Sequence, residues 1–306
     1  MNLGYACINV QLSHPPKGTE RIYTGRKMIK RTFREKGVDY ASEIILKNVQ
    51  DLDRIIDWNI LNGYKLFRIS SSMIPWKSEY DWSEVRDLEQ IKTYLHSAGV
   101  KAKTHGLRLT THPGPFNVLV SPKDSVVENC IRDLTIHGEV FDMMGQSRTP
   151  YNKINIHAGG SYGDKEASLR RLCKNFQQLP ESVQTRLTLE NDDKESGYSV
   201  KELYDGVYSN IGVPIVFDYH HHRFHPDGLS EQEAMELAMS TWPEGIRPCM
   251  HYSESRSIEK EDPKIRPQAH SDYIYDRIDT YGHDVDIVVE AKKKELAVEK
   301  YLQLHG

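Results

Sequence analysis

Residues 214 to 221 read PIVFDYHH, an apolar run that ends in Asp218 and two histidines, and a third histidine follows at 222. A short run of β-branched and aromatic residues is typical of a buried β-strand. Histidine is the commonest metal ligand in proteins, and a nearby Asp offers an oxygen to the same ion. The stretch therefore predicts a strand with metal ligands at its carboxyl end, although a solvated loop with an incidental histidine run has the same composition.

The same pattern, a short apolar run followed by a longer segment of helical period, recurs along the whole chain. It predicts strands at 2–8, 65–71, 108–112, 153–159, 186–192, 214–221, 247–253 and 284–292. Alternation of strands with helices indicates a parallel sheet. Since no linker rich in Pro, Ser or Gly divides the 306 residues, we expect an α/β protein, a single (β/α)8 TIM barrel over residues 1–306.

Two of the intervening segments carry clear helix signals. Residues 41–60 place their apolar side chains on one stripe, as a helix packed outside a barrel would. Residues 121–145 do the same, with Ser121 as the predicted N-cap, Pro122 as the first helical residue and Gly145 after the last turn.

Composition narrows the class of protein. The chain has no apolar stretch of about 18 residues and no apolar leader, so we expect no membrane contact and a cytoplasmic location. Its four cysteines are scattered and form no C-x-x-C pair, which argues against a zinc knuckle or a disulfide framework. The net charge is −4, yet one stretch, 17–36, is strongly basic and suits either a solvated helix face or a local polyanion contact.

From the third predicted strand onward, every strand ends in a potential metal ligand. The residues are His112, His157, Glu190, Asp218 with His221, His251 and Glu290, and His270 follows the seventh strand. Barrel active sites lie at the carboxyl ends of the strands, where these side chains would converge. Core packing would favour Val, Ile or Leu there, because unpaired buried carboxylates are costly. We therefore expect a metal site at this end of the barrel.

So many ligands exceed the needs of one ion. Imidazole and carboxylate together suit Mn, Zn or Fe in a cluster of about two or three ions, bridged by Glu190 and Glu290. Ions about 3.5–4 Å apart stabilise the attacking and leaving oxygens of a phosphodiester hydrolysis. Barrels with such sites also isomerise sugars, so the cluster alone leaves both chemistries open.

Several strings taken together resemble the UV damage endonuclease family. They run from the amino terminus to residue 292 and include GYACIN (4–9), FRISSSMIP (67–75), KTHGLRLTTHPG (103–114), INIHAGGSYGDK (154–165), LENDDK (189–194), VFDYHHH (216–222), AHSDY (269–273) and VVEAK (288–292). The resemblance implies a TIM barrel like that of endonuclease IV, with up to three divalent ions, manganese first and zinc or magnesium as alternatives. It also implies a nick in double-stranded DNA immediately 5′ to UV photoproducts, cyclobutane pyrimidine dimers and 6-4 photoproducts, by a monomeric enzyme that initiates excision repair.

Carried over by position, the family's ligands match the eight residues named above, and Glu190, Glu290 and His251 would be catalytic. Glu79 stands where the family has a histidine, and a carboxylate there could still bind an ion. Cys249 stands where the family has a modified lysine; it would be a softer ligand or, in the simpler interpretation, a small buried apolar residue.

Lesion and DNA contacts are also implied by the resemblance. Tyr5 and Asn9 match an amino-terminal pair placed against the lesion, with strand packing and a turn as the alternative roles. Pro115 and Phe116 replace a Gln-Tyr pair that probes the gap left by the displaced nucleotides; Phe116 could still stack, whereas Pro115 has no amide group to donate. Phosphate contacts are expected from Lys165, Lys194 and the stretch 17–36.

Three other functions remain open at this point. An apurinic-site endonuclease of the endonuclease IV type shares the barrel and the ions but prefers a missing base. A metal-dependent sugar isomerase would need neither DNA nor a basic segment. A catalytically silent DNA-binding protein would bind the lesion without cutting it.

Overall fold

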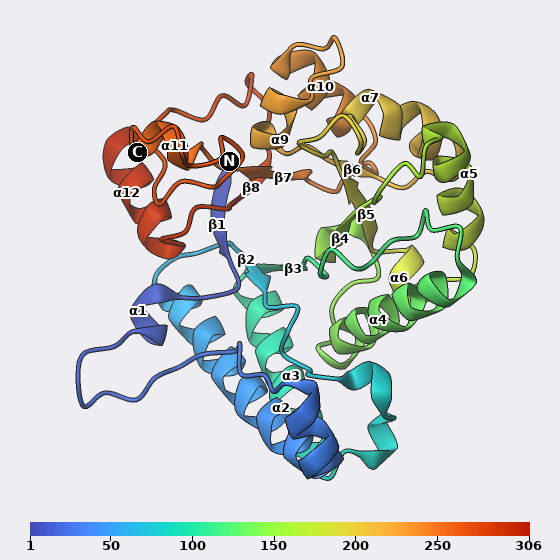
Figure 1. The fold of residues 1–306 in the computed structure, drawn as a ribbon. Helices are drawn as coiled ribbons and strands as arrows, with labels where there is room; N and C mark the ends of the chain where they lie inside the picture. The colour runs from blue at the N-terminus through green and yellow to red at the C-terminus, as the bar shows by residue number, and fades with distance from the viewer.

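Eight parallel strands surround a common axis, and the helices lie outside them (Figure 1). The computed structural model describes residues 1–306. The strands are β1 (Asn2–Ala6), β2 (Leu66–Ile69), β3 (Arg108–Thr111), β4 (Ile154–His157), β5 (Leu187–Glu190), β6 (Ile215–Val216), β7 (Cys249–Tyr252) and β8 (Asp286–Val289). Their hydrogen-bonded order is β6-β5-β4-β3-β2-β1-β8-β7. Each predicted run contains one strand, so the strand predictions are confirmed.

The sheet closes where β6 meets β7. A single parallel bridge joins Asp218 to His251, and the His251 amide donates to the Phe217 carbonyl at 2.9 Å. Sequential parallel strands that return to the first in this way form the expected (β/α)8 barrel. Closure brings the carboxyl ends of all eight strands to one face.

The longer helices cover the outside of the barrel. They are α2 (Lys30–Leu61), α3 (Leu88–Thr104), α4 (Asp124–Met143), α5 (Lys165–Phe176), α10 (Glu231–Met239) and α12 (Glu295–His305). Short helices fill the connections: α1 (Val10–Ser13), α6 (Glu181–Gln184), α7 (Val200–Leu203), α8 (Ser209–Ile211), α9 (Tyr219–Phe224) and α11 (Arg256–Glu259), with single turns at Lys77–Glu79, Trp82–Glu84, Pro150–Asn152 and Tyr204–Tyr208. No helix combines the length and the apolar character that crossing a membrane requires.

Two helix ends differ from the prediction. The helix expected from Ser121 begins at Asp124 with Lys123 as its N-cap, because the Ser121 hydroxyl accepts the Lys123 amide at 3.1 Å and forms a turn before the helix. Its predicted end is confirmed, since Gly145 adopts φ 65° just beyond Met143. The helix predicted over 41–60 extends back to Lys30 across a kink at Gly37, whose φ of 65° favours glycine.

The end of the barrel opposite the strand carboxyl ends is held by a buried ion pair. Arg108, 1% exposed, donates to a carboxylate oxygen of Asp286 at 2.9 Å. Its remaining N–H groups donate to the carbonyls of Tyr151, Arg247 and Pro150 at 2.7–3.1 Å. Both charges are therefore compensated, as buried ions must be, and the strands are fixed beneath the site.

Candidate metal centre

Glu190, the last residue of β5, lies at the centre of the ligand cluster. Its carboxylate is 1% exposed and belongs to three groups of potential ligands, each with ligand atoms within 4.8 Å of one another. The groups are His112 with His157, His251 with Glu290, and Asp218 with His221. The structure therefore brings together seven of the residues predicted from the strand ends.

Strands β3 and β4 supply the first group. His112 directly follows β3, and its Nε2 lies 3.1 Å from Oε2 of Glu190, while its Nδ1 lies 3.0 Å from the Pro113 carbonyl. His157 ends β4; its Nε2 lies 4.0 Å from Oε1 of Glu190 and its Nδ1 3.2 Å from Asp192. Each ring is thus held on one side while the other nitrogen faces Glu190, an arrangement typical of metal ligands.

The second group joins β7 to β8. Nδ1 of His251 lies 3.0 Å from Glu190 and 3.3 Å from Glu290, and the ring is fully buried. Its other nitrogen, Nε2, lies 2.8 Å from the amine of Lys153, which is also fully buried. His251 is therefore fixed between a lysine and the two carboxylates predicted to bridge ions.

The three histidines at 220–222 do not all reach the metal centre. Asp218 caps α9 through a bond from the His221 amide to Oδ1 at 2.8 Å, which turns the His221 ring toward Glu190 at 3.5 Å. His220 and His222 are buried, and His222 packs against Phe217. One of the three imidazoles therefore joins the cluster.

His270 and Arg68 complete the surroundings of Glu290. Nε2 of His270 lies 3.7 Å from Glu290, and its Nδ1 lies 2.6 Å from the Ser253 hydroxyl. The Arg68 guanidinium, from β2, forms an ion pair with the same carboxylate. Glu290 is thus approached by a neutral ring and by a permanent positive charge.

Burial and charge give these groups pKa values far from their ordinary ones. Burial raises the pKa of Asp218 to about 7 and lowers that of His251 to about 3. Burial would lower the pKa of His157, but Glu190 and Asp192 raise it to about 10. Burial would likewise raise the pKa of Glu290, but the Arg68 charge holds it well below its usual range. Such spread is typical of functional sites.

The cluster fits divalent metal ions. One buried atom in it, Oδ2 of Asp218, has no hydrogen-bond partner, and the buried Nδ1 atoms of His251 and His157 face carboxylates, Glu190 at 3.0 Å and Asp192 at 3.2 Å, without the geometry of a hydrogen bond. Unsatisfied buried polar atoms are costly, and a cation would satisfy several at once. Imidazole nitrogen and carboxylate oxygen are the donors that Mn, Zn and Fe accept.

Sequence reasoning missed three residues that contact the ligands. Lys153 holds His251, Asn155 donates to Glu190, and Arg68 pairs with Glu290. A signal for two of them existed, because Lys153, Asn155 and His157 alternate along β4 and so point to the same side of the strand.

The structure places Glu79 apart from the other predicted ligands. This residue lies in a single 3-10 turn after β2, with its side chain 45% exposed and its nearest cation, Lys30, at 3.8 Å. Glu79 is not among the clustered ligands, because the turn directs it toward α2 and solvent. Cys249 is fully buried among Ala6, Leu66 and other apolar side chains, in line with its interpretation as a small core residue.

Tyr5 and Asn9 lie inside the protein, which agrees with the alternative roles of strand packing and a turn. Tyr5 is 0% and Asn9 1% exposed. The Tyr5 hydroxyl donates to Asn59 at 2.8 Å and accepts from Asn9 at 2.9 Å, and Asn9 also caps α1. The polar groups of both side chains are hydrogen-bonded inside the protein, and neither side chain is exposed at the surface.

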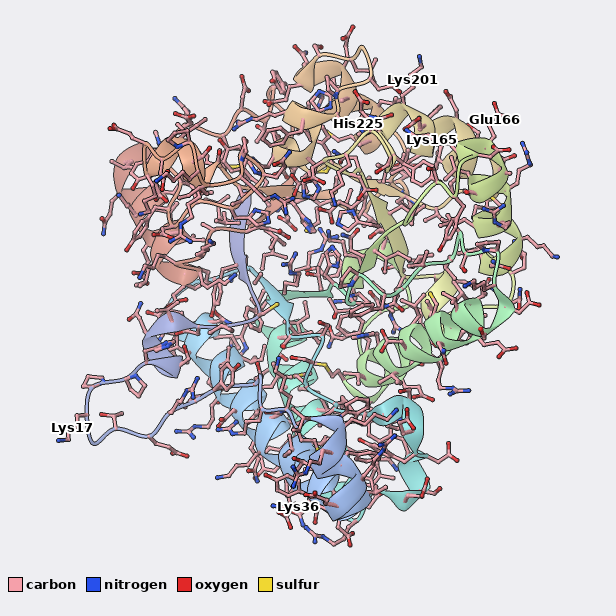
Figure 2. All side chains as sticks on the ribbon, in the orientation of Figure 1. Lys17, Lys36, Lys165, Glu166, Lys201 and His225 are labelled. Atoms are coloured by element: carbon pink, nitrogen blue, oxygen red, sulfur yellow. The ribbon has the colours of Figure 1, made fainter.

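The other predicted DNA contacts lie at the surface. Phe116 is 88% exposed, and its neighbour Pro115 is exposed as well. Lys194 is exposed, whereas Lys165 is half-buried and paired with Glu202 at 2.7 Å. Figure 2 shows Lys17 and Lys36, near the two ends of the basic stretch, at separate edges of the molecule. The two ends of the stretch 17–36 therefore do not lie in one patch.

The barrel and its ligand cluster define a class of α/β barrel proteins whose clustered histidines and carboxylates could hold metal ions. Within that class, the family model described as UV-endonuclease UvdE matches residues 1–305. The chain belongs to this family. The UV DNA damage endonuclease of Bacillus mycoides is 33% identical over 90% of this chain and 85% of its own length. The UV-damage endonuclease of Schizosaccharomyces pombe is 34% identical over 97% of this chain and 49% of its own length.

Solved structures agree with the family and the fold. The crystal structure of SacUVDE superposes with a TM-score of 0.83 at 30% identity and covers 99% of this chain and 97% of its own. Endonuclease IV of Thermus thermophilus, at 14% identity and a TM-score of 0.56, covers 83% of this chain and 93% of its own and shows the shared barrel alone.

Proposed function

We propose that this chain is a metal-dependent DNA endonuclease that nicks double-stranded DNA immediately 5′ to UV photoproducts and leaves a 3′ hydroxyl. The observation that carries the proposal is Glu190, one buried carboxylate shared by three groups of ligands at the active end of the barrel. Membership of the UV-endonuclease family supports the substrate. The cut position and the photoproducts, cyclobutane dimers and 6-4 photoproducts, belong to the proposal.

The proposed cofactors are two or three divalent ions, Mn²⁺ first. A carboxylate with its two oxygens near different histidines, as in Glu190, suits a bridge between ions. Glu290, close to both His251 and His270, suits a second bridge. When bound, such ions neutralise the phosphate and lower the pKa of a water molecule.

The protein's side chains position the ligand groups and add positive charge at the site. Glu190 and Glu290 set the positions of the ligand groups, and His251 is fixed by Lys153 from behind. The Arg68 guanidinium is held at Glu290 and adds positive charge beside the place where the phosphate would lie. Hydrolysis of a phosphodiester needs this combination of positioning and positive charge.

DNA would reach the cluster across the same face of the barrel. Phe116, on the loop after His112, is the exposed aromatic side chain nearest in sequence to a ligand and can stack on a base. Lys194, after β5, and Lys165, the first residue of α5, would contact phosphates. Lys165 would first have to exchange its bond to Glu202 for a phosphate.

The test compares three duplexes of the same sequence, which carry one thymine dimer, one abasic site or no damage. End-labelled DNA and metal-loaded protein show where and how fast each is cut. The proposal predicts a nick directly 5′ to the dimer, faster than any cut at the abasic site. Preference for the abasic site would instead assign an apurinic-site endonuclease, and no cut in any duplex would leave a DNA-binding protein or a sugar-active barrel.

A further inference from the structure

His270 lies farther from any strand along the chain than any other predicted metal ligand. It belongs to the long connection between β7, which ends at Tyr252, and β8, which begins at Asp286. Its side chain is 33% exposed, whereas those of the other histidine candidates are 0–26% exposed. It also lies outside the three ligand groups around Glu190. Contacts other than strand pairing must therefore hold His270 at the metal centre.

Hydrogen bonds fix the backbone on which His270 lies. His270 forms an antiparallel bridge with Ser255, just after the end of β7. The carboxylate of Glu259, on α11, is 3% exposed and accepts the amides of Asp272 and Tyr273 at 2.7 and 3.0 Å. The backbone is thus held at His270 and again just beyond it, so the remaining freedom is rotation of the His270 ring about its side-chain bonds.

One side-chain hydrogen bond sets the orientation of this ring. Nδ1 of His270 lies 2.6 Å from the Ser253 hydroxyl, and Nε2 lies 3.7 Å from Oε2 of Glu290. Ser253 directly follows β7 and is 0% exposed. It is two residues beyond His251, so the alternation of side chains along a strand directs both to the same side. Strand β7 therefore supplies one predicted ligand and also the hydroxyl behind another.

The bond to Ser253 determines whether the ring can bind an ion. A neutral imidazole has one N–H group and one nitrogen with a free lone pair, and a metal ion binds the nitrogen with the lone pair. An ion at Nε2 of His270 therefore requires the proton on Nδ1, which then donates to the Ser253 oxygen. Without this hydroxyl the N–H group loses its partner, and the ring is free to turn away from Glu290.

Glu290 offers His270 an oxygen that its other partners leave free. Arg68 and His251 approach Oε1 of Glu290, whereas His270 faces Oε2. The separation of 3.7 Å between Nε2 and Oε2 leaves room for one ion, since metal bonds to nitrogen and oxygen are about 2.0–2.2 Å long. This position is therefore distinct from the three ligand groups that share Glu190.

The partner of His270 differs in kind from that of His112. Nδ1 of His112 lies 3.0 Å from the Pro113 carbonyl, which can only accept a hydrogen bond. Carbonyls and carboxylates are the usual partners of metal-binding histidines. A hydroxyl can donate or accept, so Ser253 favours the ligand form of the ring less strongly than a carbonyl does. With its greater exposure as well, His270 should hold an ion more weakly than the Glu190 groups do.

We propose that Ser253 is a positioning residue, which holds the His270 ring toward an ion at Oε2 of Glu290. This ion is bound separately from the ions around Glu190, and more weakly. The inference rests on the proposed function for the presence of the ions. Ser253 acts through His270 and touches neither the ion nor the DNA.

The experiment measures metal binding without DNA. Protein stripped with a chelator is titrated with Mn²⁺ by calorimetry, and the bound ions are counted by equilibrium dialysis. Ser253→Ala removes the hydroxyl behind the ring, His270→Ala removes the ring, and a double variant removes both. Thermal unfolding of the metal-free proteins checks that each variant is folded.

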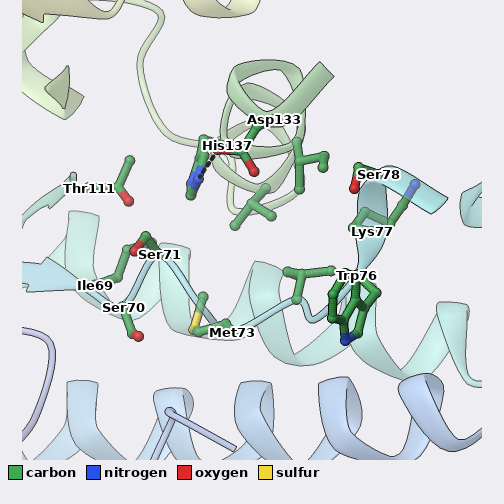
Figure 3. Close-up of a pocket in the computed structure, with 13 residues that line it drawn as sticks. Ile69, Ser70, Ser71, Met73, Trp76, Lys77, Ser78, Thr111, Asp133 and His137 are labelled. Atoms are coloured by element: carbon green, nitrogen blue, oxygen red, sulfur yellow. Dashed lines mark ion pairs between the residues drawn. The ribbon is translucent and has the colours of Figure 1, made fainter. Parts of the chain in front are cut away.

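Two controls remove a buried hydroxyl that holds no histidine ring. Ser255→Ala removes one that bonds the Ser257 hydroxyl at 2.8 Å. Thr111→Val removes one beside the predicted ligand His112; Figure 3 shows Thr111 at a pocket between the segment after β2 and helix α4, and its hydroxyl has no hydrogen bond. Both controls should bind Mn²⁺ as the wild type does.

We expect the wild type to bind one ion more weakly than the others. Ser253→Ala should lower the affinity for this ion about 10–100-fold, which is the usual cost of removing the partner of a metal-binding histidine, and should leave the tighter ions unchanged. His270→Ala should lose the weak ion. In that background Ser253→Ala should have no further effect on metal binding, whereas a general structural role of Ser253 would have the same effect in both backgrounds.

The outcomes separate this inference from the proposed function, because incision of a thymine-dimer duplex is measured independently. A protein whose weak ion alone responds to Ser253→Ala, but which never nicks DNA, contradicts the endonuclease and leaves Ser253 assigned. Unchanged metal binding in Ser253→Ala, an equal loss at every ion, or a further loss in the His270→Ala background overturns the inference, even if the protein nicks beside the dimer.

Discussion

Replacing Glu190 by Gln is the most informative change to the metal centre. The side chain keeps its size, but one ligand oxygen becomes an NH2 group and the negative charge is lost. Glu190 faces His112 at 3.1 Å, His251 at 3.0 Å and His221 at 3.5 Å, and it belongs to all three ligand groups. The substitution therefore affects every ion that the cluster would hold.

The size of the effect follows from this shared position. Removing a partner that only orients a metal ligand costs about 10–100-fold in metal affinity or activity. A carboxylate that binds the ions directly must contribute more, so incision should fall by more than about 100-fold, or about 2.7 kcal/mol in the activation barrier. Binding to the lesion duplex should change little, because the DNA contacts lie outside Glu190.

Single-turnover incision of a thymine-dimer duplex measures the rate, and thermal unfolding checks that the variant is folded. Glu139→Gln is the matched control, since the Glu139 carboxylate on α4 accepts a hydrogen bond from Trp82 at 2.8 Å and lies outside the cluster. An incision rate for Glu190→Gln within tenfold of that of the control would refute the assignment of Glu190 as the shared ligand.

Three further changes have defined outcomes. Lys153→Met removes the amine 2.8 Å from His251 and should slow incision about 10–100-fold, because His251 loses the partner that positions it. The melting temperature should not fall, since a buried amine is exchanged for an apolar chain. A lower melting temperature with unchanged incision would contradict this. Arg108→Met should lower the free energy of unfolding in urea by about 1–3 kcal/mol and leave incision at 25 °C intact, since Asp286, at the far end of the barrel, loses one of its two arginine partners and keeps Arg247 at 3.3 Å. Arg68 holds the pKa of Glu290 below its ordinary value, so in metal-free protein this pair stabilises the fold above about pH 4.5 and the contribution is lost as pH falls. The difference in free energy of unfolding between wild type and Glu290→Gln should therefore shrink from pH 6 to pH 3. A constant difference would exclude this stabilising role of the pair.

The barrel could be predicted because its strands have a strong local signal. Runs such as KINIHAG, 153–159, are too apolar for a surface and too short for a helix, and each ends in a residue that core packing would not select. The ends of buried parallel strands must meet, so the ligand cluster followed from the strand assignments alone. The position of Glu190 within all three ligand groups could not be predicted in this way, since it depends on the orientations of the histidine rings around it.

The predicted site residues that lie apart from the cluster are side chains whose direction is set by tertiary contacts. Glu79 could be matched by position, but a single turn directs it to Lys30. Tyr5 accepts a hydrogen bond from Asn9 and donates one to Asn59, 54 residues further along the chain, and nothing local signals the contact with Asn59.

The central claim, that the Glu190 cluster cuts DNA with bound divalent ions, is tested most directly by metal replacement. Protein stripped with a chelator is mixed with a labelled duplex that carries one thymine dimer, and Mn²⁺, Zn²⁺ or Mg²⁺ is then added while the cut is mapped. We predict no nick without metal, a nick directly 5′ to the dimer once Mn²⁺ is added, and no recovery in Glu190→Gln. Nicking by stripped wild-type protein in excess chelator, or full recovery in Glu190→Gln, would contradict the account.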